Sequence, residues 1–127
     1  MINVAFGGSL YQDISSLTET SINHLAPLDQ KERLIHSVIL KEGSVLKKIF
    51  NRETIKVNSF HHQSIKKVAD NFDVIGISED NIIEAIKHKG FQWILGIQWH
   101  PEMLFKKNLN QKKIFEVFIK QLKKGQE

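Results

Sequence analysis

The sequence predicts an α/β domain, because runs with the apolar pattern of strands alternate with runs whose apolar residues follow helical spacing. Residues 91–99 form the strongest strand pattern, and residues 110–124 place apolar side chains on one helical face and lysines on the other. A chain of 127 residues has room for one compact domain with a core. We therefore expect a single α/β unit, residues 1–127, in which few strands have the apolar character of a buried parallel sheet.

The N-terminal part of the chain has the weakest pattern. Residues 2–6 have helical apolar spacing that stops at Gly7-Gly8, and we expect an element that is cut in the middle. Residues 15–32 are polar and predict a long loop or a turn of helix. Loops of this length in a compact domain are often functional.

The middle of the chain predicts short strands, each with apolar or β-branched residues: residues 35–40, 55–58, 74–77 and 82–87. The last two should pair antiparallel around a turn at residues 78–81. Residues 91–99 are nearly all apolar, so we expect that strand to be buried on both faces.

Helices are expected at three places. Ser44 is a possible N-cap of a helix at residues 45–50. Residues 59–63 should open a second helix whose buried stripe consists of Ile65, Val68, Ala69 and Phe72. The third, at residues 110–124, should lie on the sheet and end at Gly125.

Composition argues against several classes of protein. The net charge is +4, but only Arg33 and Arg52 among 18 basic residues are arginines, and the lysine pairs are spread along the chain, so we expect no nucleic-acid partner. The apolar runs are too short to cross a bilayer and the N-terminus lacks a secretory signal, which predicts a cytoplasmic protein without a membrane partner. The absence of cysteine excludes disulfides and thiolate metal sites.

The tripeptide His100-Pro101-Glu102 follows the strongest strand, and strand ends are where catalytic side chains gather in α/β sheets. Pro101 favours an extended conformation at His100, so His100 and Glu102 can project to the same side of the chain. A carboxylate there could orient the imidazole as a general base. A turn with a surface histidine explains the same spacing equally well.

A second polar cluster occupies residues 58–63, where Asn58 or Ser59 could simply cap a helix. His61, His62, His100 and Glu102 could instead form a zinc site. Because adjacent histidine side chains often diverge and no His-x-x-x-His spacing occurs, we expect no metal and no other cofactor.

Four segments together strongly resemble the gamma-glutamyl-gamma-aminobutyrate hydrolase family of the class I glutamine amidotransferase-like superfamily: residues 3–14, 57–63, 84–86 and 96–102. The resemblance implies a flavodoxin-like, three-layer α/β fold. It also implies hydrolysis of a gamma-glutamyl amide or glutamine by a Cys-His-Glu triad, with His100 as the general base and Glu102 as its orienter. Ser59, His61 and Gln63 become candidate substrate-binding residues.

The sequence departs from this family in one large respect. The nucleophilic cysteine of the family lies on a tight turn shortly before the position that matches Ile2, together with oxyanion-hole amides and parallel strands of the central sheet. We therefore expect residues 1–127 to be the C-terminal half of a glutamine amidotransferase type-1 domain, without the N-terminal parallel strands. Alone, such a half should have little or no activity, because neither nucleophile nor oxyanion hole is present.

Three hypotheses follow. The first is a truncated or split family member that depends on a partner chain with the cysteine-containing half, and that exposes an apolar sheet edge, with poor solubility or oligomerisation as a result. The second is a non-catalytic ligand-binding or assembly subunit of a split enzyme with a pocket around His61 and His100. The third is a metal-assisted hydrolase.

Overall fold

The computed structural model describes residues 1–17, 22–90 and 93–125. Its helices are α1 (Ile2–Ala5), α2 (Val45–Phe50) and α3 (Leu109–Lys124), with 3-10 turns at Ile14–Ser16, Leu28–Gln30 and Pro101–Met103. Its strands are β1 (Ser9–Tyr11), β2 (His36–Leu40), β3 (Thr54–Val57), β4 (Ser64–Lys67), β5 (Phe72–Ser78), β6 (Ile83–His88) and β7 (Leu95–Ile97).

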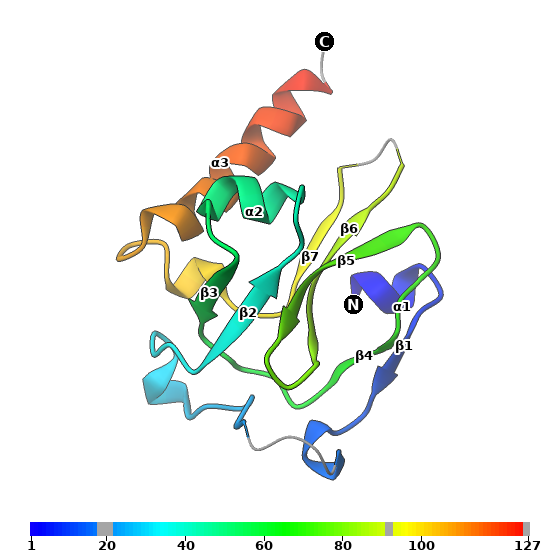
Figure 1. Ribbon diagram of the computed structural model, residues 1–127, viewed down its shortest axis with the longest axis vertical. Helices are drawn as coiled ribbons and strands as arrows, with labels where there is room; N and C mark the ends of the chain where they lie inside the picture. The colour runs from blue at the N-terminus through cyan, green and yellow to red at the C-terminus, as the bar shows by residue number, and fades with distance from the viewer. Residues whose placement is uncertain (18–21, 91–92, 126–127) are drawn as a thin grey trace.

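The strands form a five-stranded sheet of order β3-β2-β5-β6-β7 and a two-stranded ribbon of β1 and β4 (Figure 1). Every strand pair in the described part of the chain is antiparallel. Because helices and strands alternate along the chain, the expected α/β class is observed. Among the described residues, no parallel strand pair is present. Strand β7 ends the sheet, with β6 as its hydrogen-bonded neighbour.

Helices α2 and α3 cover one face of the sheet beside β2 and β3 (Figure 1). Alternating side chains of β2 and β3 point to this face and form the larger core with Leu46, Phe50, Trp99 and Ile114. Ser44 caps α2 as expected, since its Oγ accepts a hydrogen bond from the Lys47 amide at 3.1 Å. Among the described residues, no helix combines the length and apolar character that a bilayer span requires.

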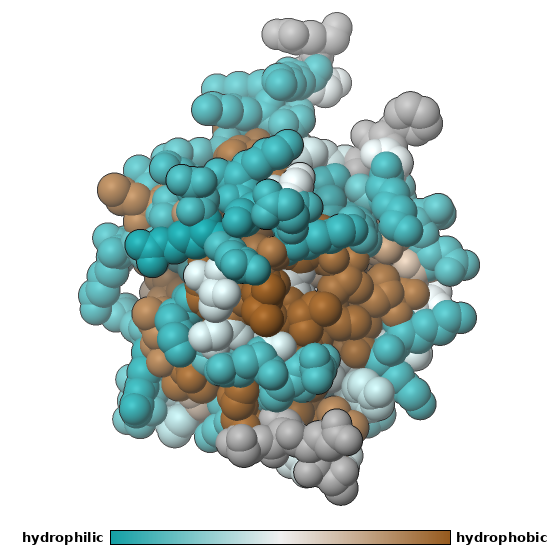
Figure 2. Space-filling view, in the orientation of Figure 1, coloured by the Kyte–Doolittle hydropathy of each residue, from teal (hydrophilic) through white to brown (hydrophobic). Residues whose placement is uncertain are grey.

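The second core lies on the opposite side and is smaller. It contains Ala69, Phe72 and Ile86, with half-buried apolar residues from α1, β4 and β5 around it. Asn3 fastens α1 to this layer: its buried amide donates to the carbonyls of Ser9 and Lys67 at 3.2 and 2.9 Å and accepts from the Ala69 amide at 2.7 Å. Figure 2 shows apolar side chains gathered in the middle of the same face, over α1 and β5.

The predicted β5–β6 hairpin is confirmed, with Asn81 in its turn at a left-handed φ of 65°. The predicted helix after residue 59 is wrong, because residues 64–67 form β4, which pairs with β1. The apolar spacing at Ile65, Val68 and Phe72 belongs to β4, the segment that follows it and the start of β5. A period near three over so few residues does not separate a helix from a strand and turn.

Two other expectations need correction. Of residues 91–99, the strand covers Leu95–Ile97, its side chains are half-buried, and residues 91–92 lie outside the described residues. The strand lacks burial on both faces because it is the last strand of the sheet. Helix α3 buries Gln111 and Ile114, whereas its later apolar residues Phe118, Ile119 and Leu122 are 43–53% exposed, because its C-terminal half projects from the body (Figure 1).

Candidate active site

His100 and Glu102 meet immediately after β7. Pro101 occupies the first position of the 3-10 turn Pro101–Met103, where its missing amide hydrogen costs nothing, and this turn brings the two side chains together. His100 Nδ1 lies 2.6 Å from Glu102 Oε1, and the two side chains are 33% and 53% exposed. Because an ionised carboxylate only accepts, His100 donates from Nδ1 and keeps the lone pair of Nε2 as a base.

Asn58 holds the backbone of His100 on both sides of its α-carbon. The fully buried Asn58 amide accepts from the His100 amide at 3.0 Å and donates to the His100 carbonyl at 3.1 Å. The same Nδ2 also donates to the Lys31 carbonyl at 2.8 Å. Next to His100, the buried Trp99 donates from Nε1 to Gln111 Oε1 of α3 at 3.1 Å. Asn58 therefore fixes the backbone of His100, Glu102 orients its ring, and Gln111 anchors the neighbouring Trp99.

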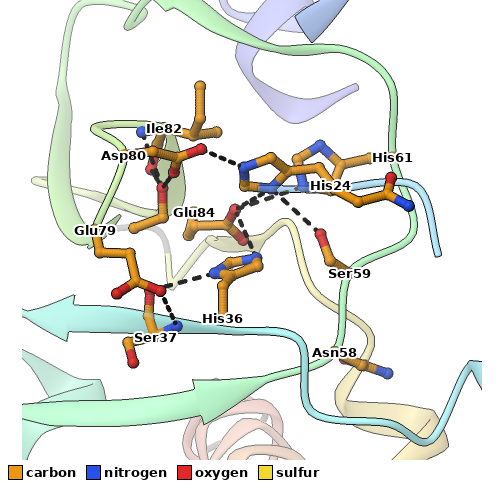
Figure 3. A network of polar contacts seen from close by, with 12 residues as sticks. His24, His36, Ser37, Asn58, Ser59, His61, Glu79, Asp80, Ile82 and Glu84 are labelled. Carbon is orange, nitrogen blue, oxygen red and sulfur yellow. Dashed lines mark hydrogen bonds and ion pairs between the residues drawn. The ribbon is translucent and has the colours of Figure 1, made fainter. Parts of the chain in front are cut away.

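The segment from Asn58 to His61 alternates between two environments. Asn58 contacts His100, and the Phe60 ring stands edge-on to the His100 ring at a centroid distance of 6.0 Å. Ser59 and His61 point to the other side, into a buried polar cluster, while Asn58 points away from that cluster (Figure 3). This alternation is what an extended segment produces, and it separates the predicted site residues into two groups.

The buried polar cluster consists of His24, His36, His61 and Glu84, with Ser59 and Asp80 beside it (Figure 3). Ser59 Oγ lies 3.3 Å from His24 Nδ1, and His24 Nε2 lies 2.7 Å from Asp80 Oδ2. Burial lowers the pKa of His24 below its ordinary value, although the bound Asp80 carboxylate acts in the opposite direction. His24, His36, Ser59, His61 and Glu84 are each 7% exposed or less, so the cluster lies in the interior of the domain.

Gln63 lies nearer the surface, where its Nε2 donates to Gln12 Oε1 at 2.9 Å. It lines an open hollow of about 490 Å³ together with Phe60, His61 and Gln98. Contact of Ser59, His61 or Gln63 with a substrate stays a prediction. The structure does not gather these three around His100: Ser59 is fully buried, and Gln63 contacts Gln12, the residue that follows β1.

The sequence analysis missed most of the residues that matter to these two groups. His24 and His36 had no local signal, because they come from a loop and from β2. Glu84 of β6 entered only through the family resemblance at residues 84–86, without a role in a site. Asn58 could have been noticed in the sequence, because it follows a strand and belongs to a polar cluster, and a buried asparagine is unusual. The expected divergence of His61 and His62 is observed, because His61 is buried and His62 is exposed.

Comparison with known proteins places these observations in a family. The peptidase C26 family matches residues 1–102. The chain is 40% identical over 118 residues to "Putative glutamine amidotransferase-like protein YvdE" of Lactococcus lactis, covering 93% of the chain and 48% of that protein. It is 32% identical over 120 residues to "Gamma-glutamyl-gamma-aminobutyrate hydrolase PuuD" of Escherichia coli, covering 91% and 47%.

Among solved structures, a glutamine amidotransferase from Thermotoga maritima superposes with a TM-score of 0.56 at 14% identity, covering 99% of this chain and 45% of that one. This likeness concerns the fold, and it confirms the expected class I glutamine amidotransferase-like fold. The chain spans about half the length of the curated relatives it matches. The family match over residues 1–102 decides the classification, and the chain belongs to the peptidase C26 family.

Proposed function

We propose that the chain contributes a general base, His100, and its orienting carboxylate, Glu102, to an enzyme that hydrolyses a gamma-glutamyl amide through a cysteine nucleophile. The observation that carries the proposal is the 2.6 Å contact between His100 Nδ1 and Glu102 Oε1 at the end of β7. Family membership supports this reaction class, since one relative has the name gamma-glutamyl-gamma-aminobutyrate hydrolase.

The chemistry follows from the tautomer that Glu102 imposes. Nε2 of His100 accepts the thiol proton, and the thiolate attacks the gamma-carbonyl carbon of the substrate. The tetrahedral intermediate expels the amine as His100 returns the proton, which leaves a gamma-glutamyl thioester. His100 then removes a proton from water, and the second tetrahedral intermediate releases glutamate and the free thiol. Glu102 stabilises the imidazolium that forms in each half of this cycle.

The nucleophile has to come from outside these 127 residues, which contain no cysteine. Ser59 does not replace it, because Ser59 is fully buried and its hydroxyl contacts His24 rather than His100. We therefore propose a Cys-containing half, as part of a longer chain or as a separate polypeptide.

The edge of β7 is the place where that half would join. Gly96 and Ile97 of β7 line the open hollow with Met1, Ile2 and Gln98. A strand added parallel to β7 would satisfy its outer hydrogen-bonding groups and cover the hollow. The carboxyl end of such a strand would lie beside His100, which is where the nucleophile must be.

A reconstitution experiment tests the proposal. Residues 1–127 are produced alone, and also joined to the half of the Lactococcus lactis relative that the chain does not match. That half is expected to carry the nucleophilic cysteine on its tight turn. Release of ammonia from glutamine and of amine from gamma-glutamyl amines is then measured. We expect activity from the joined protein and none from residues 1–127 alone.

Substitutions in the joined protein assign the roles. His100→Ala should lower kcat by about 10²–10⁴-fold, the usual contribution of a general base. Glu102→Gln should also lower kcat, because the glutamine amide no longer selects the Nδ1–H tautomer of His100. His62→Gln, which changes an exposed neighbouring histidine, should leave kcat unchanged. A folded joined protein that keeps its full kcat after His100→Ala would contradict the proposal.

A further inference from the structure

Four buried side chains from separate segments converge on one point of the interior (Figure 3). His24 belongs to the loop before β2, His36 begins β2, His61 follows β3, and Glu84 lies in β6. Their exposed fractions are 3%, 0%, 7% and 1%. One nitrogen or oxygen of each lies within 4.8 Å of those of the other three.

Each imidazole directs its other nitrogen to an oxygen outside this group. These outer contacts are His24 Nε2 to Asp80 Oδ2 at 2.7 Å, His36 Nδ1 to the Ser37 carbonyl at 3.2 Å, and His61 Nδ1 to the Gln63 carbonyl at 2.8 Å. Because carboxylates and carbonyls only accept, each of these nitrogens carries the ring hydrogen. When the rings are neutral, which is the form that binds metals, the inward nitrogens therefore present lone pairs.

The inner group then consists of acceptors only. Glu84 Oε1 lies 3.7 Å from His24 Nδ1, 3.6 Å from His36 Nε2 and 3.4 Å from His61 Nε2. Within the part of the chain that the structure describes, both Glu84 oxygens and the Nε2 atoms of His36 and His61 have no hydrogen-bond partner. Burying an unpaired carboxylate among acceptor lone pairs is costly, and a cation at the centre removes that cost.

The distances from Glu84 Oε1 match a small tetrahedral ion, while the other ligand separations, all within 4.8 Å, would shorten when the ion binds. Ligands about 2.0–2.1 Å from zinc lie roughly 3.3–3.5 Å from one another in a tetrahedron. The three distances from Glu84 Oε1, at 3.4–3.7 Å, are close to this edge and too long for the hydrogen bonds of a charged pair. Three imidazoles and one carboxylate favour zinc over magnesium or calcium, which prefer oxygen ligands.

We propose that His24 Nδ1, His36 Nε2, His61 Nε2 and Glu84 Oε1 bind one Zn²⁺ ion. The site is structural, because four protein ligands complete the tetrahedron and all four side chains are buried. Asp80 and the two carbonyls are the outer partners that fix the ligand tautomers. The Ser59 hydroxyl, 3.3 Å from His24 Nδ1, turns its hydrogen away when the metal binds.

The test uses the untagged full chain after equilibration with Zn²⁺ and removal of excess metal. Elemental analysis should give one zinc per chain, and X-ray absorption should give only nitrogen and oxygen neighbours at about 2.0–2.1 Å. Competition with a chromogenic chelator gives the affinity. Wild-type protein that retains no stoichiometric zinc, in a sample with native circular dichroism, would overturn the proposal, and this readout is independent of any hydrolase activity.

Variants identify the ligands. Glu84→Gln and His36→Gln should abolish stoichiometric zinc, whereas His62→Gln, an exposed histidine next to His61, should retain it. Asp80→Asn keeps all four ligands and should weaken zinc affinity by about 10–100-fold through the outer contact to His24. If a ligand variant fails to fold, the zinc affinity of Asp80→Asn still tests the site, because this variant keeps every ligand in place. Unchanged affinity in Glu84→Gln, or equal loss in His62→Gln, would contradict this site.

Discussion

Replacing Asn58 tests how the fold holds the candidate base. Asn58→Ala removes the three hydrogen bonds that its fully buried amide makes with the His100 amide, the His100 carbonyl and the Lys31 carbonyl. Each such bond contributes about 1 kcal/mol net, and each buried partner left without water costs about 1–3 kcal/mol. We expect a loss of about 3 kcal/mol, a large part of the roughly 5–15 kcal/mol that stabilises a typical domain.

Urea unfolding followed by tryptophan fluorescence measures this loss, since Trp99 is buried directly beside His100. Asn110→Ala is the matched control: it removes a half-exposed amide near the start of α3, and alanine favours a helix, so stability should change by less than about 0.5 kcal/mol. In the joined protein described above, Asn58→Ala should also lower kcat, because the His100 backbone is no longer fixed. Equal stability of the two variants would refute this role for Asn58.

Three further predictions concern other parts of the chain. Asn3→Ala should cost about 2–4 kcal/mol in urea unfolding, because it leaves the Ala69 amide and two carbonyls without their partner; stability within 0.5 kcal/mol of wild type would contradict it. Trp99→Phe should destabilise the chain by about 1–3 kcal/mol, because it leaves the buried Gln111 Oε1 without its hydrogen-bond donor. Trp93→Phe, at a half-buried position, should cost less. Calorimetry of residues 1–127 with glutamine should be silent if a substrate site needs the Cys-containing half, and a saturable signal would favour the ligand-binding subunit instead.

Local patterns predicted those elements whose stability is local. Ser44 as an N-cap, the β5–β6 hairpin and the start of α3 near Asn110 follow from residues within one or two turns of each other. The helix expected after residue 59 failed because β4 is stabilised by β1, which lies more than fifty residues earlier. No window of sequence contains both strands of that ribbon.

The candidate site divides in the same way. His100 and Glu102 are two residues apart, and Pro101 restricts the backbone between them, so their contact could be expected from the tripeptide. The cluster of His24, His36 and Glu84 could not, because it depends on how a loop, β2 and β6 are arranged in space. The sequence-based zinc hypothesis combined His61 with His62, His100 and Glu102 instead, because imidazoles and a carboxylate suit that metal.

The extended segment from Asn58 to His61 connects the two groups of residues mechanically. Asn58 and Phe60 contact His100, while His61 points into the buried cluster with Ser59 (Figure 3). An ion that fixes His61 would limit the movement of this segment and thereby the movement of Asn58 against His100. Removing the proposed zinc should therefore lower kcat of the joined protein without removing any group that touches the substrate. If the zinc-free joined protein kept its kcat while losing thermal stability, the two groups would be neighbours in the fold without being coupled.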